Sequence, residues 1–330
     1  MKPIAVTLGD PAGIGSEVVF KALEEISSST PVWIFGDWNW ARQSITGSQL
    51  PALKRVTGLP YSYDRGETRL FIDIAFSDSE PVRFGSIEPA YGQAALDSIQ
   101  AALESIDQGH CGSLVNAPIH KQSIALAGSE HTGHTELLAA HYGLDRYAYD
   151  YAMYFDSPTI RVALLSVHIS LADAIRQVSA EKVAALARLV HREYTKIYGA
   201  PPRIAAAGIN PHAGEGGIMG DEDEIVEEGV ALAMNDGVSI VGPLAPDTIF
   251  LSASRGKFDV VIAAYHDQGL IPVKTMHFER SVNVTLGLPF LRASVDHGTA
   301  FDIAGKGMAD AAPMAWALEW TARYAEKFRR

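Results

Sequence analysis

The stretch Asp296-His297-Gly298-Thr299-Ala300-Phe301-Asp302-Ile303-Ala304-Gly305-Lys306-Gly307, near the carboxyl end of the chain, constrains the fold and its use more than any other. Glycines three and five residues beyond Asp302 let a backbone approach a ligand closely. The ring of His297 offers a flat surface for an adenine, and the carboxylate of Asp302 can accept hydrogen bonds from a ribose diol. The stretch therefore predicts an adenosine pocket. The alternative is a glycine-rich turn before the last helix.

Composition limits the classes to which the protein can belong. The chain has 330 residues, of which 47% are hydrophobic and 20% charged, so it can bury a large core as two domains or one large α/β unit. The net charge is −12 and no run of Lys or Arg interrupts it, so we expect no nucleic-acid partner. Cys111 is the only cysteine, which excludes an internal disulfide and a thiolate zinc cluster.

The first residues lead directly into an apolar run at positions 3–8, with no recognisable leader segment before it. Nowhere do eighteen apolar residues follow one another without a charge or a turn former, so we expect no membrane span. Together with the single cysteine, these features predict a cytoplasmic protein.

Short apolar runs alternate with amphipathic segments along the chain. Buried strands are predicted at residues 4–8, 32–35, 114–115, 160–165, 204–207 and 260–264, and helices at 93–108 and 181–198. Gly109 and Gly199 are placed to end these two helices, and Ser16 to cap a helix over 17–26. Strands that alternate with helices predict an α/β fold with a mainly parallel sheet.

Three histidines directly follow predicted strands. His168 follows the strand that ends at residue 165, His212 the one that ends at 207, and His266 the one that ends at 264. Parallel sheets place ligand sites beyond the carboxyl ends of their strands, and neutral imidazole is a common ligand of divalent metals. Forty or more residues separate these histidines, so spacing alone leaves two readings open, a shared metal ion or three structural histidines.

Longer motifs carry a resemblance to a known family. They are Gly9-Asp10-Pro11-Ala12-Gly13-Ile14-Gly15, Gly133-His134-Thr135-Glu136, Asn210-Pro211-His212-Ala213-Gly214-Glu215-Gly216, Tyr265-His266-Asp267-Gln268-Gly269 and Ser294-Val295-Asp296-His297-Gly298-Thr299-Ala300. In this order, and over nearly the full length, the chain resembles the 4-hydroxythreonine-4-phosphate dehydrogenases of vitamin B6 biosynthesis. The stretch 296–307 likewise resembles the adenosine-binding loop of the isocitrate and isopropylmalate dehydrogenase group.

The resemblance implies an isocitrate/isopropylmalate dehydrogenase-like fold with two α/β domains and an active-site cleft between them. We expect residues 1–130 with 291–330 to form the first domain, and residues 131–290 to form a second domain that contributes to the interface of a homodimer. It also implies NAD and one divalent metal ion (Zn, Mg or Co), with histidine ligands drawn from both protomers.

Site residues follow from the same resemblance, position by position. The metal ligands would be His168, His212 and His266; the substrate-binding residues His134, Thr135, Lys274, Asn283 and Arg292; and the cofactor-binding residues His297, Gly298, Thr299, Ala300 and Asp302.

Physical chemistry agrees with several of these roles. A His-Thr pair that opens a helix can present donors to a phosphate, and cationic or amide side chains bind phosphate and carboxylate. Without the resemblance, a helix cap and ordinary surface residues would explain them equally well. Asp247 and Asp267 are candidates to orient a ligand histidine or a substrate amine. Lys121 is the candidate base, because a lysine near a metal ion and a nicotinamide cation can lose its proton near neutrality.

The implied reaction is the oxidation of 4-phosphohydroxy-L-threonine by NAD to a 3-keto acid, which decarboxylates to 3-amino-2-oxopropyl phosphate. Two alternatives remain. One is a dehydrogenase of D-threonate or D-erythronate 4-phosphate. The other is of a different class, a phosphate acyltransferase-like or non-redox protein that binds a phosphorylated ligand, against which the stretch 296–307 argues.

Overall fold

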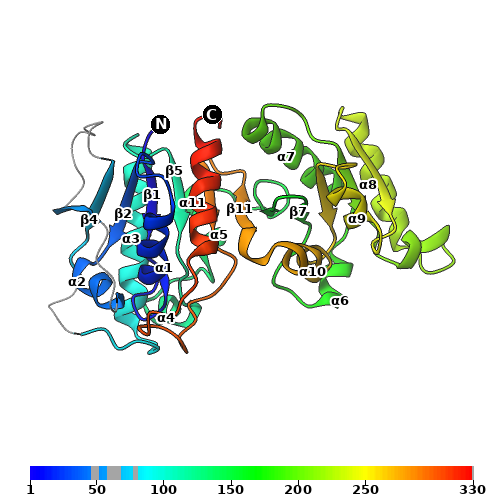
Figure 1. Cartoon of the computed structure of the whole chain (residues 1–330). Helices are drawn as coiled ribbons and strands as arrows, with labels where there is room; N and C mark the ends of the chain where they lie inside the picture. Colours follow the sequence, from blue (N-terminus) through cyan, green and yellow to red (C-terminus); the bar gives the residue numbers. More distant parts are fainter. Residues whose placement is uncertain (46–51, 58–67, 77–80, 329–330) are drawn as a thin grey trace. The chain divides into compact units, whose positions relative to one another are not determined.

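The computed structural model describes residues 1–45, 52–57, 68–76 and 81–328. The chain divides into two compact units: Met1–Leu138 with Phe290–Glu326, and Ala139–Pro289 with the residues from Lys327 onward. Both units have α/β architecture (Figure 1). The predicted α/β class is therefore confirmed. No helix in the described ranges has the length and apolar character that crossing a bilayer requires.

The sheet of the first unit is parallel throughout its described strands. Its order is β3-β4-β2-β1-β5-β12, with β1 at Ile4–Thr7, β2 at Val32–Gly36, β3 at Lys54–Thr57, β4 at Arg69–Asp73, β5 at Ser113–Asn116 and β12 at Leu291–Ser294. Strands β1, β2, β5 and β12 are buried along their whole length, as expected for strands with both faces covered.

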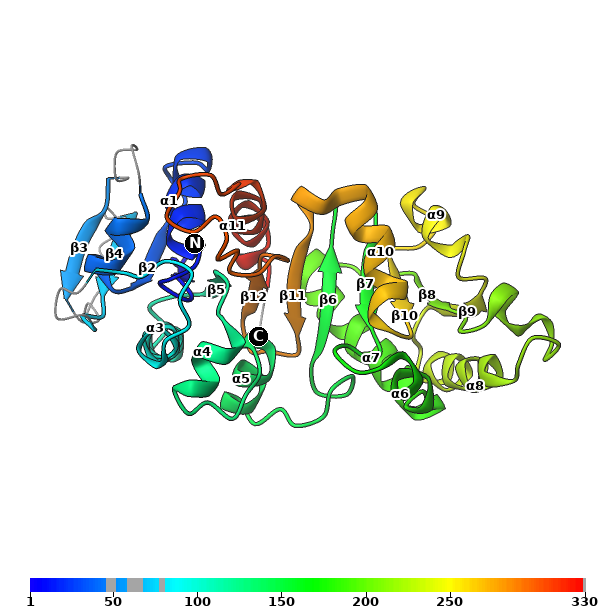
Figure 2. The same ribbon diagram turned by 90° about the horizontal axis from the view of Figure 1, so that it is seen from below.

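Helices cover both faces of this sheet. Figure 2 shows α1 (Gly15–Glu25) and α11 (Ala312–Ala325) on one face, and α3 (Pro89–Asp107) and α4 (Lys121–Leu126) on the other. The short elements α2 (Trp38–Ala41) and η1 (Arg42–Ser44) follow β2, and α5 (His134–His141) begins in the first unit and ends in the second. Helix α3 begins before the predicted residue 93, because Pro89 occupies its first turn, where the missing N–H costs nothing.

The predicted cap at Ser16 is wrong. Helix α1 begins at Gly15, and Ser16 is buried inside its first turn. A Cβ at Gly15 would lie 2.0 Å from the carbonyl oxygen of Leu8, so the helix starts in direct contact with the residue that follows β1. This close approach, and not a side-chain cap, fixes the start of the helix.

The sheet of the second unit has the order β11-β6-β7-β10-β8-β9, with β6 at Ala152–Asp156, β7 at Arg161–Leu164, β8 at Ile204–Ala207, β9 at Ile240–Leu244, β10 at Val260–Ala263 and β11 at Val282–Leu286. Strand β6 is antiparallel to both of its neighbours, and the pairs β7–β10, β10–β8 and β8–β9 are parallel. The carboxyl ends of β7, β10 and β8 therefore lie side by side.

Helices α6 (Leu171–Arg176), α7 (Ala180–Tyr198) and α8 (Glu222–Asn235) lie on one face of this second sheet, and α9 (Ile249–Ser254) and α10 (His266–His277) on the other (Figure 2). Two short 3₁₀ turns complete the unit, η2 (Pro211–Glu215) and η3 (Phe278–Arg280). Gly199 ends α7 in the left-handed conformation, as predicted. The core includes Phe155, Leu164, Phe250, Val261 and Leu270.

Candidate active site

A line of polar side chains crosses the carboxyl ends of β1, β5 and β12 in the first unit. Thr7 and Ser294 both stand opposite Asn116 in the sheet register, and Arg292 lies two residues before Ser294. The Nε of Arg292 donates to Oδ1 of Asn116 at 2.9 Å, and Nδ2 of Asn116 donates to Oγ1 of Thr7 at 2.9 Å. Arg292 is only 1% exposed. A guanidinium is thus held inside the protein by a neutral amide.

His134 lies close to this guanidinium. It is the first residue of α5, and its Nε2 is shielded from solvent without a hydrogen-bond partner. Burial, reinforced by the charge of Arg292, lowers the pKa of His134 well below its ordinary value, so the ring is neutral. Burial also lowers the pKa of Arg292 to about 9, although the nearby Glu136 opposes this shift. A shielded cation beside an unsatisfied imidazole nitrogen is an arrangement that an anionic ligand would complete.

The other predicted substrate residues are distributed over both units. Thr135, next to His134 in α5, is 7% exposed. Lys274 is a partly buried residue of α10, and Asn283 is a buried residue of β11 whose Oδ1 is shielded without a partner. Asn283 therefore resembles His134 in presenting an unsatisfied polar atom. The structure brings His134 and Arg292 together, and Lys274 and Asn283 belong to the second unit.

The three predicted metal ligands all lie beyond adjacent parallel strands of the second unit. The ring centroids of His168 and His266 are 5.6 Å apart, and Nδ1 of His266 hydrogen-bonds to Oδ1 of Asp267 at 2.7 Å. With its proton on Nδ1, His266 keeps Nε2 free to ligate a metal, the usual arrangement of a carboxylate-supported ligand. Imidazole nitrogens supported by a carboxylate are groups that divalent ions commonly take as ligands.

His212 has an unusual backbone conformation. It lies in η2 with φ 54° and ψ 26°, a left-handed conformation that few non-glycine residues adopt. Within the described ranges, no three His, Cys, Asp or Glu side chains are grouped closely enough to hold a metal ion. The structure thus brings two of the three histidines together. Asp247 is exposed in the turn between β9 and α9.

The stretch 296–307 is a loop between β12 and α11, and protein contacts anchor it at several points. The N–H of Ile14 donates to the carbonyl oxygen of Thr299 at 3.0 Å, and a Cβ at Gly13 would lie 3.0 Å from Thr299. Phe301 packs against a buried cluster of the first unit, and its ring stacks on His120 at 4.7 Å. Lys121, exposed at the start of α4, directly follows His120.

The two glycines beyond Asp302 serve the fold. Gly305 and Gly307 have φ of +73° and +70°, and a Cβ at Gly305 would lie 2.4 Å from the ring of Phe84. A Cβ at Gly298, by contrast, would meet no atom within 4 Å. Open space for a ligand therefore lies at Gly298. The ring of His297 is fixed by a 3.0 Å contact between Nδ1 and the carbonyl oxygen of Gly298, and its Nε2 is shielded without a partner.

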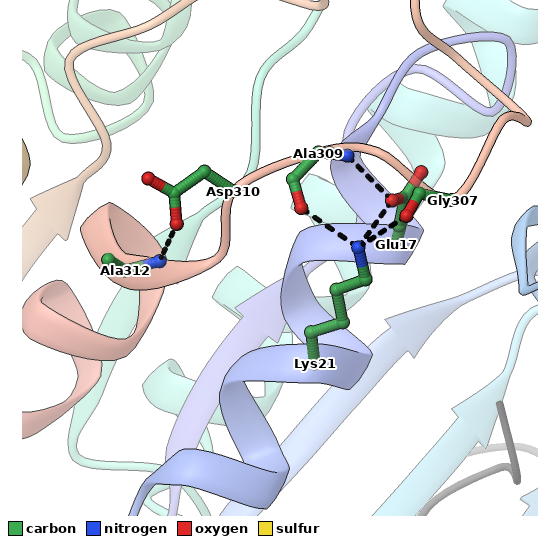
Figure 3. A network of polar contacts seen from close by, with 6 residues as sticks. All are labelled: Glu17, Lys21, Gly307, Ala309, Asp310 and Ala312. Atoms are coloured by element: carbon green, nitrogen blue, oxygen red, sulfur yellow. Dashed lines mark hydrogen bonds and ion pairs between the residues drawn. The ribbon is translucent and has the colours of Figure 1, made fainter.

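Sequence reasoning missed the ion pair that fastens the far end of this loop. Lys21 donates to Oε1 of Glu17 at 2.7 Å and to the carbonyl oxygens of Gly307 and Ala309 at 3.0 and 2.9 Å (Figure 3). Oε1 of Glu17 also accepts the N–H of Ala309 at 2.8 Å. The i,i+4 spacing of Glu17 and Lys21 was a signal for the pair. No local signal indicated its partners, 286 and 288 residues from Lys21.

Comparison with known proteins gives the family of the chain. The family described as pyridoxal phosphate biosynthetic protein PdxA matches residues 28–321. The chain belongs to the PdxA family. A relative from Beijerinckia indica, named 4-hydroxythreonine-4-phosphate dehydrogenase, is 41% identical over 97% of this chain and 94% of its own length. The D-threonate 4-phosphate dehydrogenase of Salmonella typhimurium is 37% identical over 96% of this chain and 97% of its own.

A crystal structure of 4-hydroxythreonine-4-phosphate dehydrogenase from Klebsiella pneumoniae is also similar, with a TM-score of 0.87 and 37% identity over 98% of both chains. The PdxA relatives named here are oxidoreductases. Membership in this family and the class of enzyme, both predicted from the motifs, are confirmed.

Proposed function

We propose that the protein oxidises 4-phosphohydroxy-L-threonine with NAD, in a divalent-metal-dependent reaction, to a 3-keto acid that decarboxylates to 3-amino-2-oxopropyl phosphate. The observation that carries this proposal is the shielded guanidinium of Arg292 beside the neutral, unsatisfied ring of His134. Such a pair suits an anionic substrate, and the overall charge of −12 makes a locally placed cation necessary for binding one.

Each candidate residue has a role that its chemistry supports. Arg292 offers charge-assisted donors, and Thr135 a hydroxyl, to the phosphate or carboxylate of the substrate. Lys274 and Asn283 provide a second cation and an amide for the remaining polar groups. Remote contacts of this kind hold the reacting carbon in place, so their loss reduces turnover as well as affinity.

His168, His212 and His266 would hold the divalent ion, with Asp267 orienting His266 through Nδ1. When bound, such an ion lowers the pKa of the substrate hydroxyl and polarises the keto group during loss of carbon dioxide. Lys121 is our candidate for the group that removes the hydroxyl proton, and Asp247 for a group that faces the substrate amine.

The loop 296–307 would bind the adenosine half of NAD. Gly298 leaves space for close approach, and the shielded Nε2 of His297 can accept a hydrogen bond from the cofactor while its Nδ1 is protonated. The carboxylate of Asp302 is exposed and can accept hydrogen bonds from the two hydroxyls of the ribose. Thr299, whose carbonyl oxygen accepts the N–H of Ile14, and Ala300, whose carbonyl oxygen accepts the N–H of Ile303, complete this surface.

We further propose a cytoplasmic homodimer. Helix α10 carries His266 and Lys274. Three large apolar side chains on or just after this helix are exposed: Ile271 to 64%, Met276 to 50% and Phe278 to 58%. Large apolar side chains that remain exposed near a proposed site are candidates for contact with a second protomer. Sedimentation of the purified protein tests the assembly: a monomer at micromolar concentration would contradict it.

The proposed reaction is tested by NADH absorbance with three phosphorylated acids, 4-phosphohydroxy-L-threonine, D-threonate 4-phosphate and D-erythronate 4-phosphate. We expect the first to give the highest kcat/KM. Preference for D-threonate 4-phosphate would favour the second candidate, which the similarity to the Salmonella enzyme supports. If the protein binds all three acids but forms no NADH with any of them, the result would instead indicate the non-redox or acyltransferase-like class.

A further inference from the structure

Two residues without an assigned role, Thr7 and Asn116, connect strand β1 to Arg292. We propose that Asn116, supported by Thr7, is a positioning residue that aims the Arg292 guanidinium at an anionic group of the substrate, and that it must be neutral to do so. The inference rests on the proposed function, because it takes Arg292 as a substrate-binding residue. It concerns two side chains that lie 109 residues apart in the sequence.

Sheet geometry explains why these side chains meet. Thr7 stands directly opposite Asn116, and Arg292 stands opposite Leu114, two residues before Asn116. Side chains two residues apart project from the same face of a strand, so Arg292 and Asn116 are diagonal neighbours on one face. Asn116 is 0% exposed and Thr7 is 0% exposed, so water cannot replace either contact.

The amide also has a defined orientation. Its Oδ1 faces the Nε–H of Arg292, and its Nδ2 donates to the hydroxyl oxygen of Thr7. A flipped amide would place two N–H donors against each other at Arg292 and leave the threonine oxygen without its donor. The contact with Thr7 therefore fixes the amide, and the amide oxygen in turn holds the Nε–H of the guanidinium.

Neutrality matters because Arg292 is buried. A carboxylate in place of the amide would form a buried ion pair with the guanidinium at about the distance that Oδ1 now has. An incoming phosphate or carboxylate would then meet a further fixed negative charge, in addition to the nearby carboxylate of Glu136. An amide supplies the same acceptor atom without adding that charge, so it does not weaken the attraction between Arg292 and an anionic substrate.

Asn116→Asp separates this role from a merely structural one. The substitution preserves size and the acceptor, so we expect a melting temperature equal to or above that of the wild type. We expect the KM for the phosphorylated substrate to rise at least about tenfold. The KM for NAD should stay within about twofold, because the adenosine loop is a separate segment. Asn235→Asp, the same change at an exposed position of α8, is the matched control and should alter neither KM.

Thr7 provides a second, graded variant. Thr7→Val leaves the buried Nδ2 of Asn116 without its acceptor, so we expect a higher substrate KM. Thr7→Ser restores a hydroxyl and should recover most of the wild-type KM, a rescue that a loss of packing would not show. A Thr7→Ser variant as impaired as Thr7→Val would remove Thr7 from the proposal.

Binding of inorganic phosphate, measured by titration calorimetry, distinguishes failure of this inference from failure of the proposed function. If no phosphorylated acid gives NADH but phosphate binds to the wild type and not to Asn116→Asp, the function is wrong and the inference stands. If the wild type and Asn116→Asp have equal substrate KM, or bind phosphate equally, the inference is overturned. It is also overturned if the wild type binds neither phosphate nor substrate, or if Asn116→Asp lowers the melting temperature and raises both KM values together.

Discussion

Replacing Lys21 by Met should release the far end of the loop 296–307. The ammonium makes three contacts: Oε1 of Glu17 at 2.7 Å and the carbonyl oxygens of Gly307 and Ala309 at 3.0 and 2.9 Å (Figure 3). Methionine keeps the length and apolar stem of the side chain but removes the charge and all three donors. The carboxyl group of Glu17, only 2% exposed, would keep the N–H of Ala309 and lose its cation.

The size of the effect follows from these contacts. Loss of one partner of a buried ion pair costs about 3 to 5 kcal/mol, and hydrogen bonds to charged groups contribute about 1.5 to 3 kcal/mol. The side chain of Lys21 is 31% exposed, so solvent screening reduces these values. We therefore expect unfolding to become easier by about 2 to 3 kcal/mol, and the melting temperature to fall by roughly 4 to 12 °C.

The loop should respond as well as the fold. Because Gly307 and Ala309 follow the proposed ribose contact at Asp302, their release should raise the dissociation constant for NAD by about three- to tenfold. Thermal unfolding followed by circular dichroism measures the first effect. Fluorescence titration with NAD measures the second without depending on turnover.

Lys196→Met is a matched control. Lys196 is 33% exposed and pairs with Glu193, itself 2% exposed, at 3.0 Å. Arg192 also binds Glu193, so that carboxylate keeps a cation when the lysine is lost. We expect the control to cost less than about 1 kcal/mol and to leave NAD affinity unchanged. The reasoning is refuted if Lys21→Met melts within 1 °C of the wild type, or if both variants weaken NAD binding equally.

Three further predictions concern the cofactor, the thiol and the metal. The kcat/KM of the wild type should be at least about tenfold higher with NAD than with NADP, and Asp302→Ser should reduce this ratio. Equal kcat/KM values for both cofactors in the wild type would show that Asp302 does not contact the ribose. Burial raises the pKa of Cys111 from 9.0 to about 12, so the unfolded chain loses this proton first as the pH rises. Below pH 9 this thiol should not affect the free energy of unfolding; between pH 9 and 12 it should lower that free energy by at most about 1.4 kcal/mol per pH unit. In urea titrations, Cys111→Ala should remove this contribution to the pH dependence, and an unchanged pH dependence would contradict the role given to Cys111. A chelator should abolish turnover, and added metal should restore it. His168→Ala or His266→Ala should abolish turnover even with added metal, while circular dichroism shows that the fold is retained. Full activity of the metal-free enzyme would exclude the metal role.

Local sequence patterns determined several of the helices and strands, whereas the candidate site residues came from the family resemblance. Apolar runs placed β1, β7, β8 and β10 correctly, and glycine ended α7 where the pattern indicated. The rule that ligand sites lie beyond the carboxyl ends of parallel strands left both a shared site and separate structural histidines open, and the structure places the rings of His168 and His266 5.6 Å apart. The bounds of strands and helices depend on residues near one another in the chain, so a single sequence can reveal them.

Other features depend on which segments meet, and the sequence does not contain that information locally. Ser16 has the right chemistry for a helix cap, yet the helix begins two residues earlier than predicted, at Gly15, which lies in close contact with Leu8. Gly305 looked like a ligand-approach glycine, but the ring of Phe84 is what excludes a side chain there.

The partners of Arg292 and Lys21 likewise became known only from the tertiary structure. Each is more than 170 residues from a side chain or carbonyl that it binds. Periodicity reports which face of an element is buried, but strand order and register decide which buried groups become neighbours. Asn116 therefore looked like an ordinary residue at the end of a strand until β12 was placed beside β5, where its amide holds a buried guanidinium.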